Sequence, residues 1–344
     1  MKKYLYKVIT PFPIILIISF MAFMLIFPDI CKSAAIKGLL LCSNVIIPTL
    51  FPFTFCVIFI INSSVEKYIY PIKTVIKKIF RQSPQEFAIM ILSFIGGYPV
   101  GAKLISRLDN KSNKKAQLML CYCVNAGPGF IVMAIGQGIM RSKEIGYILL
   151  VAHIIPPLIM ALILRFFTPK SDFSNAPQEK VSISDNIVIS ASDSASAVMA
   201  VCGYVILFSA INSFLDYCTL KLPFIKYITP FLEVTSAVAQ TKNVYLIAFL
   251  TGFGGICVWC QVKGMAKGIR FNFLYFAAAR IFHGFCSLAI TRLLLKFFKI
   301  TIPTISNGVS FKGEISYSGT ALTLSLLGMG ILFIISTFKR KTEP

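Results

Sequence analysis

The ionisable residues that could do chemistry in this chain lie inside long apolar stretches. They are His153, Asp193, Glu233, Arg280 and His283. An ionisable group at membrane depth is costly and usually faces a partner or a substrate pathway. Arg280 and His283 are three residues apart, so they share one face of a helix and could both bind an anion. A structural alternative stays open, in which Arg280 pairs with Glu233 or Asp193.

Motifs for enzymatic chemistry are weak in this sequence. Cys257-Val258-Trp259-Cys260 has the spacing of a redox or metal motif, but there is no second such motif and the chain has two histidines. We therefore interpret this spacing as chance and predict no enzyme, no catalytic residue, no cofactor and no metal. The alternative, a membrane-bound thiol oxidoreductase, would be excluded if a double Cys257→Ser, Cys260→Ser variant kept full activity.

Two glycine pairs interrupt apolar segments 158 residues apart, at Gly96-Gly97 and at Gly254-Gly255. At the same offset, Asn125 corresponds to His283. Glycine pairs and Gly-Pro steps release backbone groups from the helical ladder, and an unsatisfied group in hydrocarbon costs several kcal/mol. Repeats of inverted topology that contain broken helices indicate a substrate site near the membrane midplane. The alternative is that the glycines only allow close helix packing.

The candidate substrate-binding residues cluster around these interruptions and the buried charges. We expect Asn125 and Glu233 to orient a ligand, and Lys103, Arg280 and His283 to balance its charge. The full set is Gly96, Gly97, Tyr98, Pro99, Lys103, Asn125, Gly127, Pro128, Glu233, Thr235, Gly254, Gly255, Gln261, Arg280 and His283.

The elements that must position these residues are membrane helices. Of the 344 residues, 56% are hydrophobic and 14% are charged, and the mean hydropathy is +0.79. This leaves too little polar surface for a water-soluble protein. A helix that crosses a bilayer needs about 20 apolar residues. Uncharged stretches of that order run over Val8–Pro28, Gly38–Val65, Ala116–Met140, Ile145–Leu164, Ser194–Leu215 and Ile315–Phe338.

The net charge of +21 arises mainly between the apolar stretches, where it would face anionic lipid headgroups instead of nucleic acid. Ten basic residues between Asn62 and Lys115 place that region in the cytoplasm by the positive-inside rule. Residues 64–81 are predicted to form an amphipathic helix in the membrane interface, or alternatively a connecting helix packed on the protein. The run from Glu86 to Arg107 is predicted to enter and leave on the same side, as a re-entrant hairpin.

We therefore predict an all-α integral membrane protein with one polytopic domain over residues 1–344. It has two inverted repeats with broken, re-entrant helical hairpins and an extra first transmembrane helix. The predicted parts are a first transmembrane helix (1–33), repeat 1 (34–168), a polar loop (169–186), repeat 2 (187–338) and a basic tail (339–344).

Several sequence runs carry a family resemblance: Gly96–Lys103, Asn125–Val132, Gly203–Ser209, Leu232–Thr235, and Gly254-Gly255 followed by Gln261. From about residue 38 to 298, the chain resembles the sporulation integral membrane protein YlbJ family. That family contains a nucleoside-recognition or gate-type repeat, similar to the core of concentrative nucleoside transporters. Residues 256–260 depart from the family pattern, which affects any role carried over to them.

The resemblance implies a multi-pass protein in the cell membrane or a spore-surrounding membrane of a spore-forming bacterium. It also implies passage of dipicolinic acid, a small aromatic dicarboxylate, into the forespore. We expect a transporter that moves a small polar or anionic organic solute by alternating access, with dipicolinic acid favoured. The alternatives are a nucleoside-type transporter and a non-transporting scaffold for spore formation. The expected partners are the solute and membrane lipids, and no nucleic acid; a coupling ion and a homo-oligomer stay open.

Overall fold

The computed structural model describes residues 11–108, 113–168, 182–219 and 222–300, and all regular elements within them are helices. The predicted span Ile315–Phe338, the basic tail and most of the polar loop lie outside these residues. Five helices are long and apolar enough to cross a membrane: Pro28–Asn62, Lys143–Leu164, Ile183–Thr219, Val244–Met265 and Phe273–Phe297. The prediction of an all-α membrane protein with several spans is confirmed.

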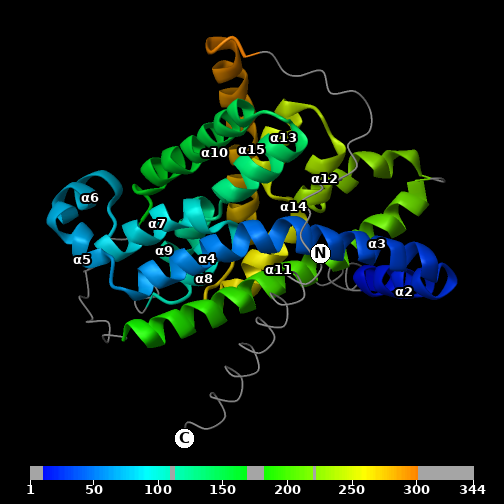
Figure 1. Ribbon diagram of the computed structural model, residues 1–344, viewed down its shortest axis with the longest axis horizontal. Helices are drawn as coiled ribbons and strands as arrows, with labels where there is room; N and C mark the ends of the chain where they lie inside the picture. The colour runs from blue at the N-terminus through cyan, green and yellow to red at the C-terminus, as the bar shows by residue number, and fades with distance from the viewer. Residues whose placement is uncertain (1–10, 109–112, 169–181, 220–221, 301–344) are drawn as a thin grey trace, which may run out of the picture.

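The first long span is built from α3 (Pro28–Leu41), a short π-helical turn η1 (Cys42–Ile46) and α4 (Ile47–Asn62). This span begins at Pro28, so helix α3 continues past residue 33, where the first transmembrane helix was predicted to end. The preceding α2 (Pro11–Ile26) is a separate helix of 16 residues. Its Phe23 packs against Phe214 and Tyr217 of α11 (Ile183–Thr219), with ring centroids 5.1 and 5.3 Å apart. The long helices α3–α4 and α11 lie side by side along the lower part of Figure 1.

The segment predicted as one amphipathic helix forms three short pieces: α5 (Glu66–Ile69), η2 (Tyr70–Ile72) and α6 (Lys73–Phe80). Pro71 cannot donate to a continuous helical ladder, which explains the division. Ile76 is buried against the protein, whereas Tyr68 and Val75 are 84% and 54% exposed. The segment therefore packs on the protein along one side and leaves apolar side chains outward, as an interfacial position requires; that position stays a prediction.

The first glycine pair lies in a helical hairpin formed by α7 (Pro84–Gly96) and α8 (Tyr98–Ile105). Ser83 and Glu86 form a capping box that begins α7. Gly97 has a φ of +83°, which is a conformation that favours glycine. A Cβ atom on Gly101 would lie 3.1 Å from the Cβ of Ser93. Residues eight apart come this close only if the chain folds back, as predicted for Glu86–Arg107.

The uncharged stretch Ala116–Met140 is not a single span, which corrects one expectation. Helix α9 (Asn113–Tyr122) ends before a non-helical segment at 123–127, and the π-helical η3 (Gly129–Ile139) follows. The break contains the Asn125-Ala126-Gly127-Pro128 run, whose glycine and proline disfavour a continuous helix. Helix α10 (Lys143–Leu164) then crosses the molecule.

In the second half, η4 (Pro223–Tyr227), η5 (Thr229–Phe231) and α12 (Val234–Gln240) precede the second glycine pair. Helices α13 (Val244–Phe253) and α14 (Gly255–Met265) meet at Gly254, whose φ is +84°. Together they form one interrupted candidate span, Val244–Met265, and not a second hairpin. The expectation that both glycine pairs lie in hairpins is therefore wrong for this half. The inverted relation between the halves stays a prediction.

Helix α15 (Phe273–Phe297) is a span that the uncharged stretches do not reveal. Arg280 and Arg292 interrupt its apolar sequence. In the structure, Arg280 is fully buried within the protein and Arg292 is exposed. The charge of Arg280 therefore does not face lipid, and a helix that carries it can still cross the membrane.

Candidate functional site

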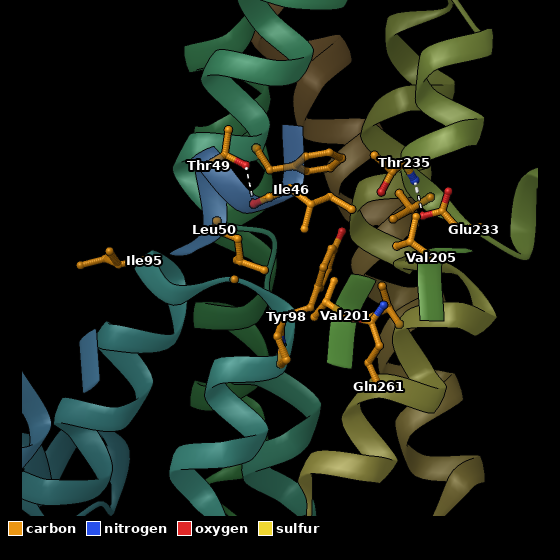
Figure 2. Close-up of a pocket in the computed structure, with 16 residues that line it drawn as sticks. Ile46, Thr49, Leu50, Ile95, Tyr98, Val201, Val205, Glu233, Thr235 and Gln261 are labelled. Carbon is orange, nitrogen blue, oxygen red and sulfur yellow. Dashed lines mark hydrogen bonds between the residues drawn. The ribbon is translucent and has the colours of Figure 1, made fainter. Parts of the chain in front are cut away.

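A pocket lies where the first hairpin, the break after α9, the long helix α11 and the second half of the chain meet (Figure 2). Its polar lining comes from Thr49, Tyr98, Glu233, Thr235 and Gln261. Aliphatic, aromatic, proline and glycine residues complete the wall: Ile46, Leu50, Ile95, Gly97, Pro99, Gly127, Phe130, Val201, Val205, Val234 and Val258. The cavity has a volume of about 60 Å³. Sites for small molecules commonly measure about 300–1,000 Å³, so the cavity in this conformation is smaller than a typical site for an organic solute.

Glu233 is held at this pocket by the start of helix α12. Its carboxylate oxygens accept hydrogen bonds from the backbone N–H groups of Thr235 (2.8 Å) and Ser236 (2.6 Å). The side chain is therefore the N-cap of the helix, where the helix dipole favours a negative charge. Glu233 is 1% exposed, so this capping supplies the partners that a buried carboxylate needs.

The two glycine breaks touch each other beside the pocket. The Tyr98 hydroxyl, at the tip of the first hairpin, donates to the carbonyl of Thr251 at 2.6 Å. A Cβ on Gly254 would lie 3.6 Å from Cε1 of Tyr98. Figure 2 shows the Tyr98 ring in the middle of the pocket. Because the helix is interrupted at Gly254, the carbonyl of Thr251 lacks a helical N–H partner. The hydroxyl of Tyr98 donates to this carbonyl instead.

We predict that Tyr98→Phe loosens this contact without unfolding the protein. Loss of one buried hydrogen bond costs about 1 kcal/mol, and more if the Thr251 carbonyl stays unsatisfied. A lower melting temperature in detergent would show it, whereas Tyr68→Phe, at a position 84% exposed, serves as the neutral control. Equal melting temperatures for the two variants would contradict the assigned contact.

Arg280 does not reach the pocket, contrary to its predicted role in binding an anion. Its guanidinium donates to the backbone carbonyls of Phe253 (Nε, 3.3 Å), Gly252 and Val124. These carbonyls lie where α13 ends and just beyond the end of α9, which are the negative ends of two broken segments. Within the described residues, Arg280 forms no ion pair with Glu233 or Asp193, so the structural alternative left open by the sequence is not observed either.

Lys103 is likewise held away from the pocket. Its ammonium lies 3.3 Å from a carboxylate oxygen of Asp193 on α11 and donates to the Asp193 carbonyl at 2.7 Å. Arg107 forms a second ion pair with the same carboxylate. The predicted contribution of Lys103 to ligand charge is not seen in this conformation, because its charge is paired with Asp193.

The side chains of His283 and Asn125 also bind backbone carbonyls next to helix interruptions. Pro157 has no N–H, so the carbonyl of His153 lacks its helical partner, and Nε2 of His283 lies 2.9 Å from it. The Asn125 amide donates to the carbonyl of Tyr122 at 2.9 Å, at the end of α9. Neither side chain lines the pocket. The ligand-orienting and charge-balancing roles expected of them therefore have no support in this geometry.

The structure thus divides the predicted residues into two groups. Gly97, Tyr98, Pro99, Gly127, Glu233, Thr235 and Gln261 line the pocket, whereas Gly96, Lys103, Asn125, Pro128, Gly254, Gly255, Arg280 and His283 lie outside its lining. Thr49 and most of the apolar lining were not predicted from the sequence: Ile46, Leu50, Ile95, Phe130, Val201, Val205, Val234 and Val258. Thr49 follows Pro48 in an apolar run, which is a weak signal, and no sequence signal distinguishes Val201 or Val205 from lipid-facing residues.

Comparison with known proteins adds one relative. The chain is 23% identical to the sporulation integral membrane protein YlbJ of Bacillus subtilis (strain 168), over 320 aligned positions that cover 78% of each chain. The resemblance to the YlbJ family is thereby confirmed. No family model matches the chain, and no solved structure matches it. The similarity to YlbJ, together with the five apolar helices, identifies a multi-pass integral membrane protein.

Proposed function

We propose that this protein transports a small polar organic solute across a membrane of a sporulating cell by alternating access. The observation that carries the proposal is the pocket beside the two glycine breaks, which has buried polar groups and is bounded by both halves of the chain. Broken membrane helices that meet at a buried site are typical of secondary transporters. The relative is described as a sporulation protein, which supports the cellular context.

Dipicolinic acid is the first candidate solute. Its two carboxylates need positive potential, which Lys103, Arg280 and His283 do not supply at the pocket. The N-terminal end of α8, at Gly97 and Tyr98, borders the cavity and carries partial positive charge. The charge of Glu233 is offset by the amides of α12 that it caps. A dicarboxylate can therefore bind here once the cavity widens.

A nucleoside is the second candidate, and the polar lining favours it. Glu233, Gln261, Thr49 and Thr235 present the acceptors and donors that ribose hydroxyls and base edges use. A neutral solute also avoids placing carboxylates beside Glu233. These two candidates predict different transported molecules, so one assay separates them.

The test is exchange of labelled dipicolinate, or of labelled uridine, into proteoliposomes preloaded with the same unlabelled compound. We expect exchange of one of the two, and a loss of roughly tenfold or more in Gln261→Ala, because this change removes a polar contact worth about 1–2 kcal/mol. Glu233→Gln should reduce uridine exchange by a similar factor but should not reduce dipicolinate exchange, because it removes a negative charge beside the two carboxylates. Gln at position 233 keeps an oxygen for the helix cap. Glu144→Gln, an exposed carboxylate on α10, is the matched control and should exchange like the unmodified protein.

Exchange of neither compound would contradict the proposal. A non-transporting scaffold predicts a different pattern in the cell, in which Glu233→Gln and Gln261→Ala sporulate normally and accumulate dipicolinate while substitutions at the protein surface abolish both.

A further inference from the structure

A second group of buried polar side chains lies between α10 and α15, apart from the pocket. It comprises His153 on α10 and His283, Ser287 and Thr291 on α15, all of which are 0–1% exposed. His153 Nδ1, His283 Nδ1, Ser287 Oγ and Thr291 Oγ1 have no hydrogen-bond partner. An unsatisfied polar atom in a membrane interior costs free energy. Four of them together indicate a site that takes a polar guest.

The two imidazoles have defined and complementary roles. His153 Nε2 accepts the backbone N–H of Ala126 at 2.8 Å, so the ring proton of a neutral His153 is on Nδ1. A carbonyl can only accept, so His283 Nε2 must donate to His153 O at 2.9 Å, which leaves Nδ1 of His283 as a free proton acceptor. The ring centroids are 4.4 Å apart. The pair thus offers one proton donor and one proton acceptor.

The hydroxyls extend this pair along one helix. His283, Ser287 and Thr291 are spaced by four residues, so they share one face of α15 over about 12 Å. Serine and threonine hydroxyls can both donate and accept, which is what relay of a proton through bound water requires. This row of three side chains runs toward the C-terminal end of α15.

The surroundings oppose a stable imidazolium in this conformation. Arg280, one turn before His283 on α15, is a buried cation. Helix α9 contributes the thiol of Cys121 and α8 the phenol of Tyr98, and α13 faces α15 with Phe249 and Gly252, which do not titrate. No acidic side chain within the described residues forms an ion pair with either histidine. A proton on His283 therefore favours a different conformation. This preference is the condition for coupling proton binding to a conformational change of the protein.

We propose that His153, His283, Ser287 and Thr291 form a proton-binding site, distinct from the solute pocket, that couples proton movement to transport. The proton binds Nδ1 of His283 and leaves along the Ser287 and Thr291 hydroxyls. This coupling rests on the proposed transport function.

The first test measures solute uptake into proteoliposomes with and without an imposed pH gradient. We expect the gradient to accelerate uptake by the unmodified protein at least fivefold and to have no effect on His283→Gln or Thr291→Val. Exchange at equal pH should stay within twofold in both variants, because neither residue lines the pocket. Arg292→Gln, exposed on the same helix, should keep the acceleration. Uptake by the unmodified protein that ignores the gradient would overturn the coupling.

The second test does not depend on transport. The chain contains two histidines, so ¹⁵N imidazole resonances of the protein in lipid nanodiscs report on this pair alone. We expect one imidazole to convert to imidazolium between pH 8 and pH 5 as the protein leaves the conformation described here, and Thr291→Val to slow that conversion. Two imidazoles that stay neutral over the whole range would overturn the proton site. Lack of exchange at equal pH would instead contradict the transport function itself.

Discussion

Arg280→Leu is expected to be among the most damaging single substitutions in this protein. The guanidinium satisfies three buried carbonyls from two broken segments, at Val124, Gly252 and Phe253. The Phe253 carbonyl keeps the indole of Trp259 as a partner, so the carbonyls of Val124 and Gly252 lose theirs. Each buried acceptor left without a partner costs about 1–3 kcal/mol, so we expect a loss of about 2 kcal/mol or more in unfolding free energy after the gain from removing a buried charge. Arg280→Lys keeps the charge but cannot span three carbonyls, so it should recover less than half of the loss.

The single tryptophan makes this effect measurable where it occurs. Trp259 Nε1 donates to the carbonyl of Phe253 at 3.0 Å, beside the Arg280 contact. Its fluorescence should report both the lower midpoint of denaturation and a wetter environment in Arg280→Leu. Arg292→Leu, at an exposed position of the same helix, is the matched control and should unfold like the unmodified protein. Equal midpoints for the two leucine variants would show that Arg280 does not hold the broken segments.

Gly101→Ala is expected to have the second large effect. A Cβ at this position would lie 1.7 Å from the carbonyl oxygen of Cys123, which is backbone and cannot rotate away. Helix α8 would have to move off the break after α9, so we expect a destabilisation of about 3 kcal/mol or more. The pocket would also be disturbed, since Tyr98 begins the same helix.

The control for this substitution is Gly203→Ala, in the exposed middle of α11, where no atom lies within 4 Å of the added Cβ. Alanine is the better helix former by about 1 kcal/mol, so this variant should be neutral or slightly more stable. Melting temperatures in detergent measure the difference. If Gly101→Ala melted within 2 °C of Gly203→Ala, the close packing of α8 on the break would be wrong.

The positions of the breaks were predictable from sequence, but their shapes were not. Glycine pairs in apolar runs predict interruptions, and both occur with positive φ at Gly97 and Gly254. The ψ angles differ, however, at 174° and −16°, so one pair turns the chain back and the other continues it across the molecule. Identical glycine pairs do not encode this choice, because a glycine backbone permits both conformations.

The partners of the buried charges could not be predicted for a related reason. Sequence rules state that Arg280 and His283 need partners at membrane depth, and both have them. The partners are backbone carbonyls freed by a glycine break and by Pro157, which no side-chain pattern reveals. The same holds for Asn125, which caps the end of α9. Residues next to the breaks on the pocket side, such as Tyr98, Glu233 and Gln261, were found because they combine polarity with proximity to a break.

The central claim is that the pocket beside the two glycine breaks opens in turn to each side of the membrane. The most direct measurement is labelling of Thr235→Cys, in a variant with the ten native cysteines replaced, by a membrane-impermeant methanethiosulfonate reagent applied to one face at a time. Our account predicts labelling from either face, slowed by whichever of dipicolinate or uridine the protein exchanges. Labelling from one face alone, or labelling that the exchanged solute leaves unchanged, would contradict it.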